Sequence, residues 1–176
     1  MRNLVEFVLR SGDLDNRRTA GAKKEAMQAG GRLHRKIQKR MGSEYRAEVS
    51  LKHTVDEEEF KLLVEGRADG VIEEASGCTI DEIKCIYMDL KYLEDADPVH
   101  LAQAKCYAYF LACDRELAAA GVQITYCNIE TEEIKRFRFD FSFEELEQWF
   151  LGLVHEYVKW ARFQYRHNLR RQESLK

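Results

Sequence analysis

The chain has a single proline, Pro98, no C-x-x-C pair of cysteines and no long run of apolar residues. Its apolar stretches are much shorter than the roughly 20 residues that cross a membrane as a helix, so we expect no membrane partner. The five cysteines are an odd number and fall within strand-like or helix-like patterns. This usage favours buried thiols in a reducing compartment over disulfides or a zinc site. Residues 1–3 lead into an amphipathic segment, expected as a short helix at 3–10, rather than into a signal peptide, and we therefore expect a cytoplasmic protein.

The charges are segregated along the chain. With 176 residues, 45% of them hydrophobic, we expect one domain, 1–176, with a substantial core. The net charge of -3 divides into +7 for residues 1–52 (13 Lys and Arg against 6 Asp and Glu), -15 for residues 53–158 (9 against 24) and +5 for residues 159–176 (6 against 1). Basic ends around an acidic centre fit a polyanion held beside a cation-binding site, although charge runs are usually solvated faces.

The stretch 65–87 is patterned as a β-hairpin with charged groups where apolar ones would be expected. Its β-branched residues supply two strands, and Ala75-Ser76-Gly77 supplies the turn between them. A tight turn at Ala75 and Ser76 makes the numbers of paired residues sum to about 151, which places Asp69 opposite Glu82. Because side chains alternate along a strand, Glu82 and Lys84 point to the same side. Two carboxylates and an ammonium would therefore gather at one place.

Such a group fits a hard divalent cation held by carboxylate oxygens and waters, with the lysine facing a water or a phosphate. The triplet alone is weak, because E-x-K or D-x-K occurs four times in the sequence and is usually surface charge. Only the triplet 82–84 follows a G-x-x-D step, Gly66 to Asp69, through a short turn and precedes a capped helix.

Residues 19–41 are patterned as an amphipathic helix that contains two adjacent glycines. Gly30 and Gly31 each cost about 1 kcal/mol relative to alanine in a helix interior. His34 follows three and four residues later, so the bare glycine surface would lie beside its imidazole. We expect room there for an ion or a phosphate next to His34, although a lone histidine is more often a surface group or a satisfied core group.

Two further strands are expected at 46–53 and 60–65, joined by an acidic turn at 56–59. Glu48 lies within the first of them. It would touch the predicted site through a water, or it would point outward as an ordinary strand carboxylate.

Asp97 followed by Pro98 is an N-cap and a first-turn proline, which predicts a helix that continues through Ala120 and stops at Gly121. The helix carries a polar stripe that would be either its wet side or a set of groups facing the hairpin. The members of this stripe are His100, Gln103 and Tyr107.

Residues 122–129 and 134–141 predict a second strand pair, with alternating phenylalanines on an inward face. Ser142 and Glu145 form a capping box that opens a final helix. The end of that helix mixes aromatic and basic residues, in the manner of a nucleic-acid surface or of a core helix that emerges into solvent.

Four motifs together resemble those of a known family. The order G-G-x-x-H at 30–34, G-x-x-D at 66–69, E-x-K at 82–84 and Q-x-x-x-Y at 103–107 resembles the RecB-like branch of the PD-(D/E)XK nuclease superfamily. The resemblance implies a restriction-endonuclease-like α/β/α sandwich with a central mixed β-sheet. It also implies hydrolysis of DNA phosphodiester bonds with Mg²⁺ or Mn²⁺, in DNA repair or recombination.

The resemblance implies a role for each matched residue. It makes His34, Asp69 and Glu82 metal ligands, together with the carbonyl of Ile83. Asp69 and Glu82 also count among the catalytic residues. The resemblance places Lys84 at the attacking water.

The same resemblance gives Gln103 and Tyr107 the task of ordering the site or the DNA strand. The overall pattern is also similar to the nuclease-type segment that precedes the motor in some bacterial Rad3/DinG-like helicases, which implies a longer chain and a helicase domain or subunit as partner. Some relatives carry a four-cysteine iron–sulfur cluster. Because no cysteine follows Cys127, we expect no such cluster here.

Two other functions remain open at this point. One is a module of nuclease-like fold that binds DNA or docks a helicase without cutting, for which a broken motif would be the signature. The other is a metal-free interaction domain that uses the basic ends of the chain.

Overall fold

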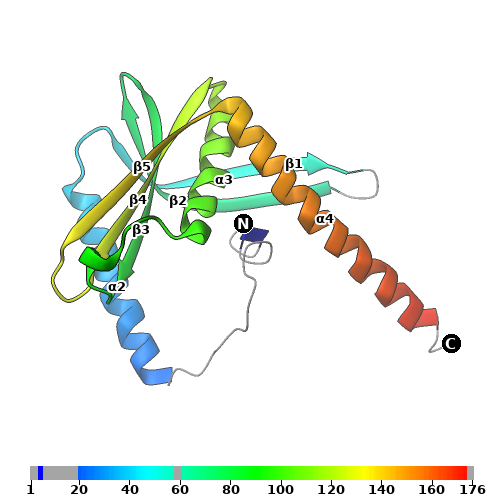
Figure 1. Cartoon of the computed structure of the whole chain (residues 1–176), viewed down its shortest axis with the longest axis horizontal. Helices are drawn as coiled ribbons and strands as arrows, with labels where there is room; N and C mark the ends of the chain where they lie inside the picture. Colours follow the sequence, from blue (N-terminus) through cyan, green and yellow to red (C-terminus); the bar gives the residue numbers. More distant parts are fainter. Residues whose placement is uncertain (1–3, 6–19, 58–60, 174–176) are drawn as a thin grey trace.

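The computed structural model of the chain describes residues 4–5, 20–57 and 61–173, with the side chains of 20–24 and 164–173 left out (Figure 1). The helix predicted at 3–10 lies outside the described residues apart from Leu4 and Val5, which are buried. Eight further helices and strands follow, together with a short 3-10 helix at Leu90–Tyr92. They are α2 (Ala20–Arg40), β1 (Tyr45–Asp56), β2 (Lys61–Glu74), β3 (Gly77–Ile86), α3 (Pro98–Arg115), β4 (Ala119–Asn128), β5 (Ile134–Ser142) and α4 (Phe143–Glu173). Within these ranges no helix is long and apolar enough to cross a membrane.

The five strands form one mixed sheet in the order β1-β2-β3-β4-β5, in which β3 and β4 are parallel and the other neighbours are antiparallel. Two hydrophobic clusters cover its two faces. On one face, Leu33 and Ile37 of α2 pack with Ile83 of β3. On the other, α3 and α4 pack over residues such as Ile80. The predicted α/β/α sandwich with a central mixed sheet is therefore confirmed.

The central hairpin has the predicted register. Glu74 pairs with Gly77 across the two-residue turn, and the ladder continues to Gly70 opposite Asp81. The pairing of β2 with β3 ends there, whereas β2 is paired with β1 along most of the length of β2. In Figure 1, β1 and β2 extend as a long ribbon away from the other strands. Separate strands were expected at 60–65 and in the first half of the hairpin. In the structure these residues form the single strand β2, which leaves β3 at Asp69 and continues paired with β1.

The helix after Pro98 is shorter than predicted. It begins as expected, with the Asp97 side chain accepting a hydrogen bond from the Val99 amide at 2.8 Å. It ends at Arg115, because Glu116 adopts a left-handed conformation with φ 53°. The alanines before Gly121 favour a helix by propensity, but Ala119 and Ala120 belong to β4, which pairs with β3 and β5. Tertiary packing overrides the local preference here.

The second strand pair and the last helix follow the predicted pattern. β4 and β5 pair antiparallel, and the three phenylalanines of β5 pack against the core. The capping box is present, since the Ser142 amide donates to Glu145 Oε2 at 2.8 Å and the Glu145 amide donates to Ser142 Oγ at 3.1 Å. The inner stripe of α4 continues this core.

His53 of β1 is half-buried among three aromatic rings of the core. Its ring centroid lies 5.0 Å from that of Tyr109, 5.5 Å from that of Phe110 and 5.6 Å from that of Phe150. Burial lowers the pKa of His53 below its usual value of 6.5, because the imidazolium would lose hydration, and Asp114 opposes this only in part. The neutral ring is therefore the form that the fold accommodates.

The free energy of unfolding should decrease as the pH falls below about 6.5, because the unfolded chain takes up the proton on His53 before the folded chain does. The contribution of His53 to the free energy of unfolding is complete at pH values above the pKa of His53 in the unfolded chain. It is lost as the pH falls through the lower pKa of His53 in the folded chain. Urea unfolding at several pH values measures it. Relative to the wild type, His53→Leu should lose less stability between pH 7.5 and about 5. If the free energies of unfolding of the two proteins changed with pH in parallel, this account would be contradicted.

Candidate metal centre

Asp69 lies at the point where β2 leaves β3, and its side chain replaces the backbone pairing that ends there. Its Oδ2 accepts a hydrogen bond from the Ile83 amide at 2.7 Å. The Asp69 carbonyl accepts another from Gln38 Nε2 at 2.9 Å. Burial raises the pKa of the Asp69 carboxyl, and the Ile83 amide, His34 and Lys84 counteract this increase. One carboxylate oxygen is thus fixed by the fold while Oδ1 faces α2.

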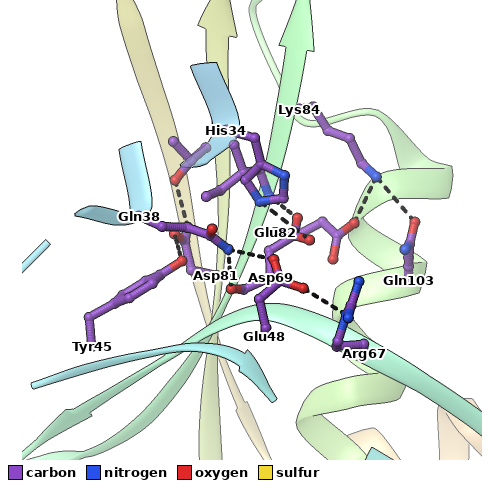
Figure 2. Close-up of polar contacts among 12 residues, drawn as sticks. His34, Gln38, Tyr45, Glu48, Arg67, Asp69, Asp81, Glu82, Lys84 and Gln103 are labelled. Carbon is purple, nitrogen blue, oxygen red and sulfur yellow. Dashed lines mark hydrogen bonds and ion pairs between the residues drawn. The ribbon is translucent and has the colours of Figure 1, made fainter. Parts of the chain in front are cut away.

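His34 of α2 provides the group on that side. Its Nε2 lies 3.5 Å from Asp69 Oδ1. The same nitrogen is buried and has no hydrogen-bond partner among the described residues. The imidazole therefore points at Asp69 with a coordinating atom unused (Figure 2).

Glu82 and Lys84 of β3 form an ion pair on the side of the sheet that faces α3. Lys84 Nζ lies 2.7 Å from Glu82 Oε1 and 3.3 Å from Gln103 Oε1, so the ammonium bridges β3 and α3 (Figure 2). Glu82 is only 2% exposed, and its second oxygen, Oε2, is buried without a hydrogen bond from any described residue. Burial raises the pKa of Glu82 to about 7; Lys84 opposes this shift, and the charge of Asp69 adds to it.

Gln103 and Tyr107 face the hairpin from α3. The buried Tyr107 hydroxyl accepts hydrogen bonds from the Gln103 side chain and the Arg67 backbone, and burial raises its pKa to about 12. A Cβ at Gly66 would lie 2.6 Å from this hydroxyl, so only glycine fits at the first position of the G-x-x-D step. His100, the third member of the polar stripe, lies elsewhere and contacts the Tyr126 hydroxyl at 2.9 Å.

Glu48 of β1 is the site residue that the sequence did not assign. Neighbouring pairs, Ala47 with Gly70 and Val49 with Ala68, place it opposite Asp69. Its φ of 58° is a left-handed conformation that is rare for a residue with a side chain.

The Glu48 carboxylate is held at the edge of the site by two partners. Its Oε1 accepts a hydrogen bond from Gln38 Nε2 at 2.8 Å, and its Oε2 lies 2.6 Å from Arg67 Nε. Glu48, His34 and Asp69 each offer one ligand atom, and these atoms lie within 4.8 Å of one another. This group shares two residues with the predicted set and contains Glu48 where Glu82 was expected.

A separate buried cluster supports β3 beside the site. Asp81 is 0% exposed and lies on the side of the strand opposite to Glu82. Its carboxylate accepts hydrogen bonds from Tyr45 at 3.1 Å, from Gln123 at 3.0 Å and from Thr125 at 2.6 Å. The Tyr45 ring covers Gly70, where no Cβ would fit. Three donors satisfy this charge within the protein, so we interpret Asp81 as structural.

The comparisons with known proteins do not identify a family. No family model matches the chain, and no curated protein matches it. Among solved structures, the fold is similar to the crystal structure of SSO0001, with 14% identity, a TM-score of 0.49, and coverage of 88% of this chain and 83% of that chain. A likeness at this level supports no functional conclusion.

The residues present fit a divalent cation. Carboxylate oxygens suit Mg²⁺ and Mn²⁺, and imidazole is a ligand for many transition metals. A buried polar atom without a hydrogen bond costs about 1–3 kcal/mol. His34 Nε2 is such an atom, and a cation held with Glu48 and Asp69 would give it a partner. Glu82 Oε2 is another such atom, although Glu82 is not a member of the group whose ligand atoms lie within 4.8 Å of one another. The Ile83 carbonyl remains a predicted ligand, while its amide already contacts Asp69.

Saturating Mn²⁺ should stabilise the wild-type chain, by about 2.7 kcal/mol at 100 times the Kd, which corresponds to a Tm increase of about 5–10 °C. Asp69→Asn removes a ligand charge with little change of shape, so most of this increase should disappear. Asp89→Asn is the matched control, because the Asp89 side chain is partly exposed and, among the described residues, pairs with the neighbouring Lys91. If Mn²⁺ raised the Tm of Asp69→Asn as much as that of the wild type, the ion would bind elsewhere.

Proposed function

We propose that the chain is a metal-dependent DNA nuclease that hydrolyses phosphodiester bonds. The observation that supports this most directly is the group of His34, Glu48 and Asp69, whose ligand atoms lie within 4.8 Å of one another and in which the buried His34 Nε2 has no hydrogen bond to any described residue. Beside them stands the ammonium of Lys84. Unused donors of these types, next to a cation that the protein holds in place, fit a centre that binds a metal ion and a phosphate together.

Phosphodiester hydrolysis accumulates negative charge on the phosphate oxygens as water attacks in line. A divalent ion, when bound, would neutralise part of that charge and make the attacking water more acidic. The chain's own groups would orient the reactants. Asp69 keeps Oδ1 available because Ile83 fixes Oδ2, and Glu82 keeps Oε2 available because Lys84 occupies Oε1.

Lys84 would complete the positive charge around the phosphate. Its ammonium is held between Glu82 and Gln103, so it need not be ordered when substrate arrives. Gln103 is held in turn by Tyr107, whose hydroxyl lies against Gly66 at the start of the G-x-x-D step. These two residues of α3 would act as positioning residues for Lys84.

The broader setting is part of the same proposal. The resemblance of the four motifs supports a role in DNA repair or recombination beside a helicase domain or subunit. The alternative is a module that binds DNA without cutting it. The intact charges of Asp69, Glu82 and Lys84 favour cleavage over binding alone.

Cleavage of end-labelled single-stranded and duplex DNA in Mg²⁺, in Mn²⁺ and in EDTA tests the proposal. The wild type should cut only with metal, and Lys84→Ala should reduce the rate by at least about 100-fold, the effect of removing one transition-state partner. Lys91→Ala is the matched control, because Lys91 ends another of the four E-x-K or D-x-K triplets and is itself exposed. Asp69→Ala should abolish cleavage, and His34→Ala should weaken metal binding less completely.

Lys84→Met, which retains much of the aliphatic stem, serves as a second variant if Lys84→Ala fails to fold, and circular dichroism checks both. An unchanged cleavage rate in either folded variant would remove Lys84 from the mechanism. Binding of DNA without metal-dependent cutting by the wild type would favour the non-cleaving module.

A further inference from the structure

The outer face of α2 carries a concentration of positive charge that the proposed chemistry does not use. Its cationic residues line a shallow depression of about 350 Å³, and they are Arg32, Arg35, Lys36, Lys39 and Arg40. In the part of the chain that the structure describes, only Lys36 among them has an ion-pair partner, which is Glu132. Most exposed lysines and arginines elsewhere in the described part of the chain have carboxylate partners, for example Arg115 of α3 with Glu73 and Lys61 of β2 with Asp56.

This face lies next to the row of α2 residues that contacts the candidate metal centre. Residues four apart stack in rows along an α-helix, and successive residues are offset by 100°. His34 and Gln38 form the row that contacts Asp69 and Glu48. Arg35 and Lys39 form the next row outward, and Gly31 precedes them in the same row. A DNA strand bound at Asp69 that leaves the site by crossing α2 would therefore meet Arg35 and Lys39.

Packing against the described residues does not require a glycine at position 31. A Cβ built there would meet only Arg35 Nη1, at 3.6 Å, which is an ordinary van der Waals separation. An alanine would fit and would favour the helix by about 1 kcal/mol. Glycine in such a place allows close approach of a ligand to the helix backbone.

We infer that the row formed by Gly31, Arg35 and Lys39 is a binding surface for the sugar-phosphate backbone of DNA, next to the phosphate that is cut. The inference rests on the proposed function and specifies one part of the substrate's path. Unpaired cations favour a polyanion by charge complementarity, and the release of its counterions supplies the binding free energy. Because the contacts are to phosphates, this surface would grip the strand without reading its sequence.

Binding of a fluorescent single-stranded oligonucleotide in EDTA, followed by anisotropy at several salt concentrations, tests the surface without cleavage. Arg35→Gln combined with Lys39→Gln should weaken binding by about tenfold or more and lower the slope of log K against log salt by about 1.4, for two lost phosphate contacts at about 0.7 each. Lys52→Gln combined with Lys61→Gln removes the same charge from the β1–β2 ribbon and should have little effect. Equal losses in the two double variants would overturn the inference, because they would reflect net charge alone.

Gly31→Ala separates a binding role from a structural one. It should raise the Tm and also weaken binding of the oligonucleotide. Gly152→Ala is the matched control, since Gly152 lies in α4 with nothing within 4 Å of its Cβ position and should raise the Tm without changing binding. Full binding by a stabilised Gly31→Ala protein would contradict the close approach at Gly31.

Failure of this inference is distinguishable from failure of the proposed function. If the wild type cuts DNA with metal and the Arg35 and Lys39 double variant has an unchanged KM, the surface is wrong and the nuclease stands. If the double variant loses binding while the wild type never cuts, the surface stands and the nuclease is wrong. Absence of any DNA binding by the wild type in EDTA would overturn the surface directly.

Discussion

The hydrogen bond from the Ile83 amide to Asp69 Oδ2 is the contact on which the candidate site depends. It forms where the ladder between β2 and β3 ends, so a carboxylate stands where the next backbone pairing would be. Where the strands diverge, His34 of α2 and Glu48 of β1 bring ligand atoms within 4.8 Å of the Asp69 carboxylate.

The two consecutive acids of β3 show how the fold separates a structural charge from a functional one. Asp81 receives three hydrogen bonds from Tyr45, Gln123 and Thr125. Glu82 is nearly as buried, but among the described residues it receives only the ammonium of Lys84, and its Oε2 has no hydrogen bond. Because an unsatisfied buried oxygen is costly, the difference indicates which side of the strand is arranged for a ligand.

Much of the site was predictable because the hairpin turn at Ala75 and Ser76 fixes the register from a few local residues. Glu48 was left between a place at the site and an outward position, because its placement depends on the β1–β2 pairing and on a left-handed backbone, neither of which has a local signature. The end of α3 was misplaced because alanines before Gly121 favour a helix locally, while the pairing of Ala119 and Ala120 in β4 is decided by the whole sheet.

Crystals of the chain soaked in Mn²⁺ and measured for anomalous scattering test the central claim most directly. The claim is that strand divergence at Asp69 creates one cation site. It predicts a single strong peak within bonding distance of His34 Nε2 and Asp69 Oδ1, with Glu48 or Glu82 completing the protein ligands. A peak elsewhere, or none at a Mn²⁺ concentration that stabilises the protein, would contradict it.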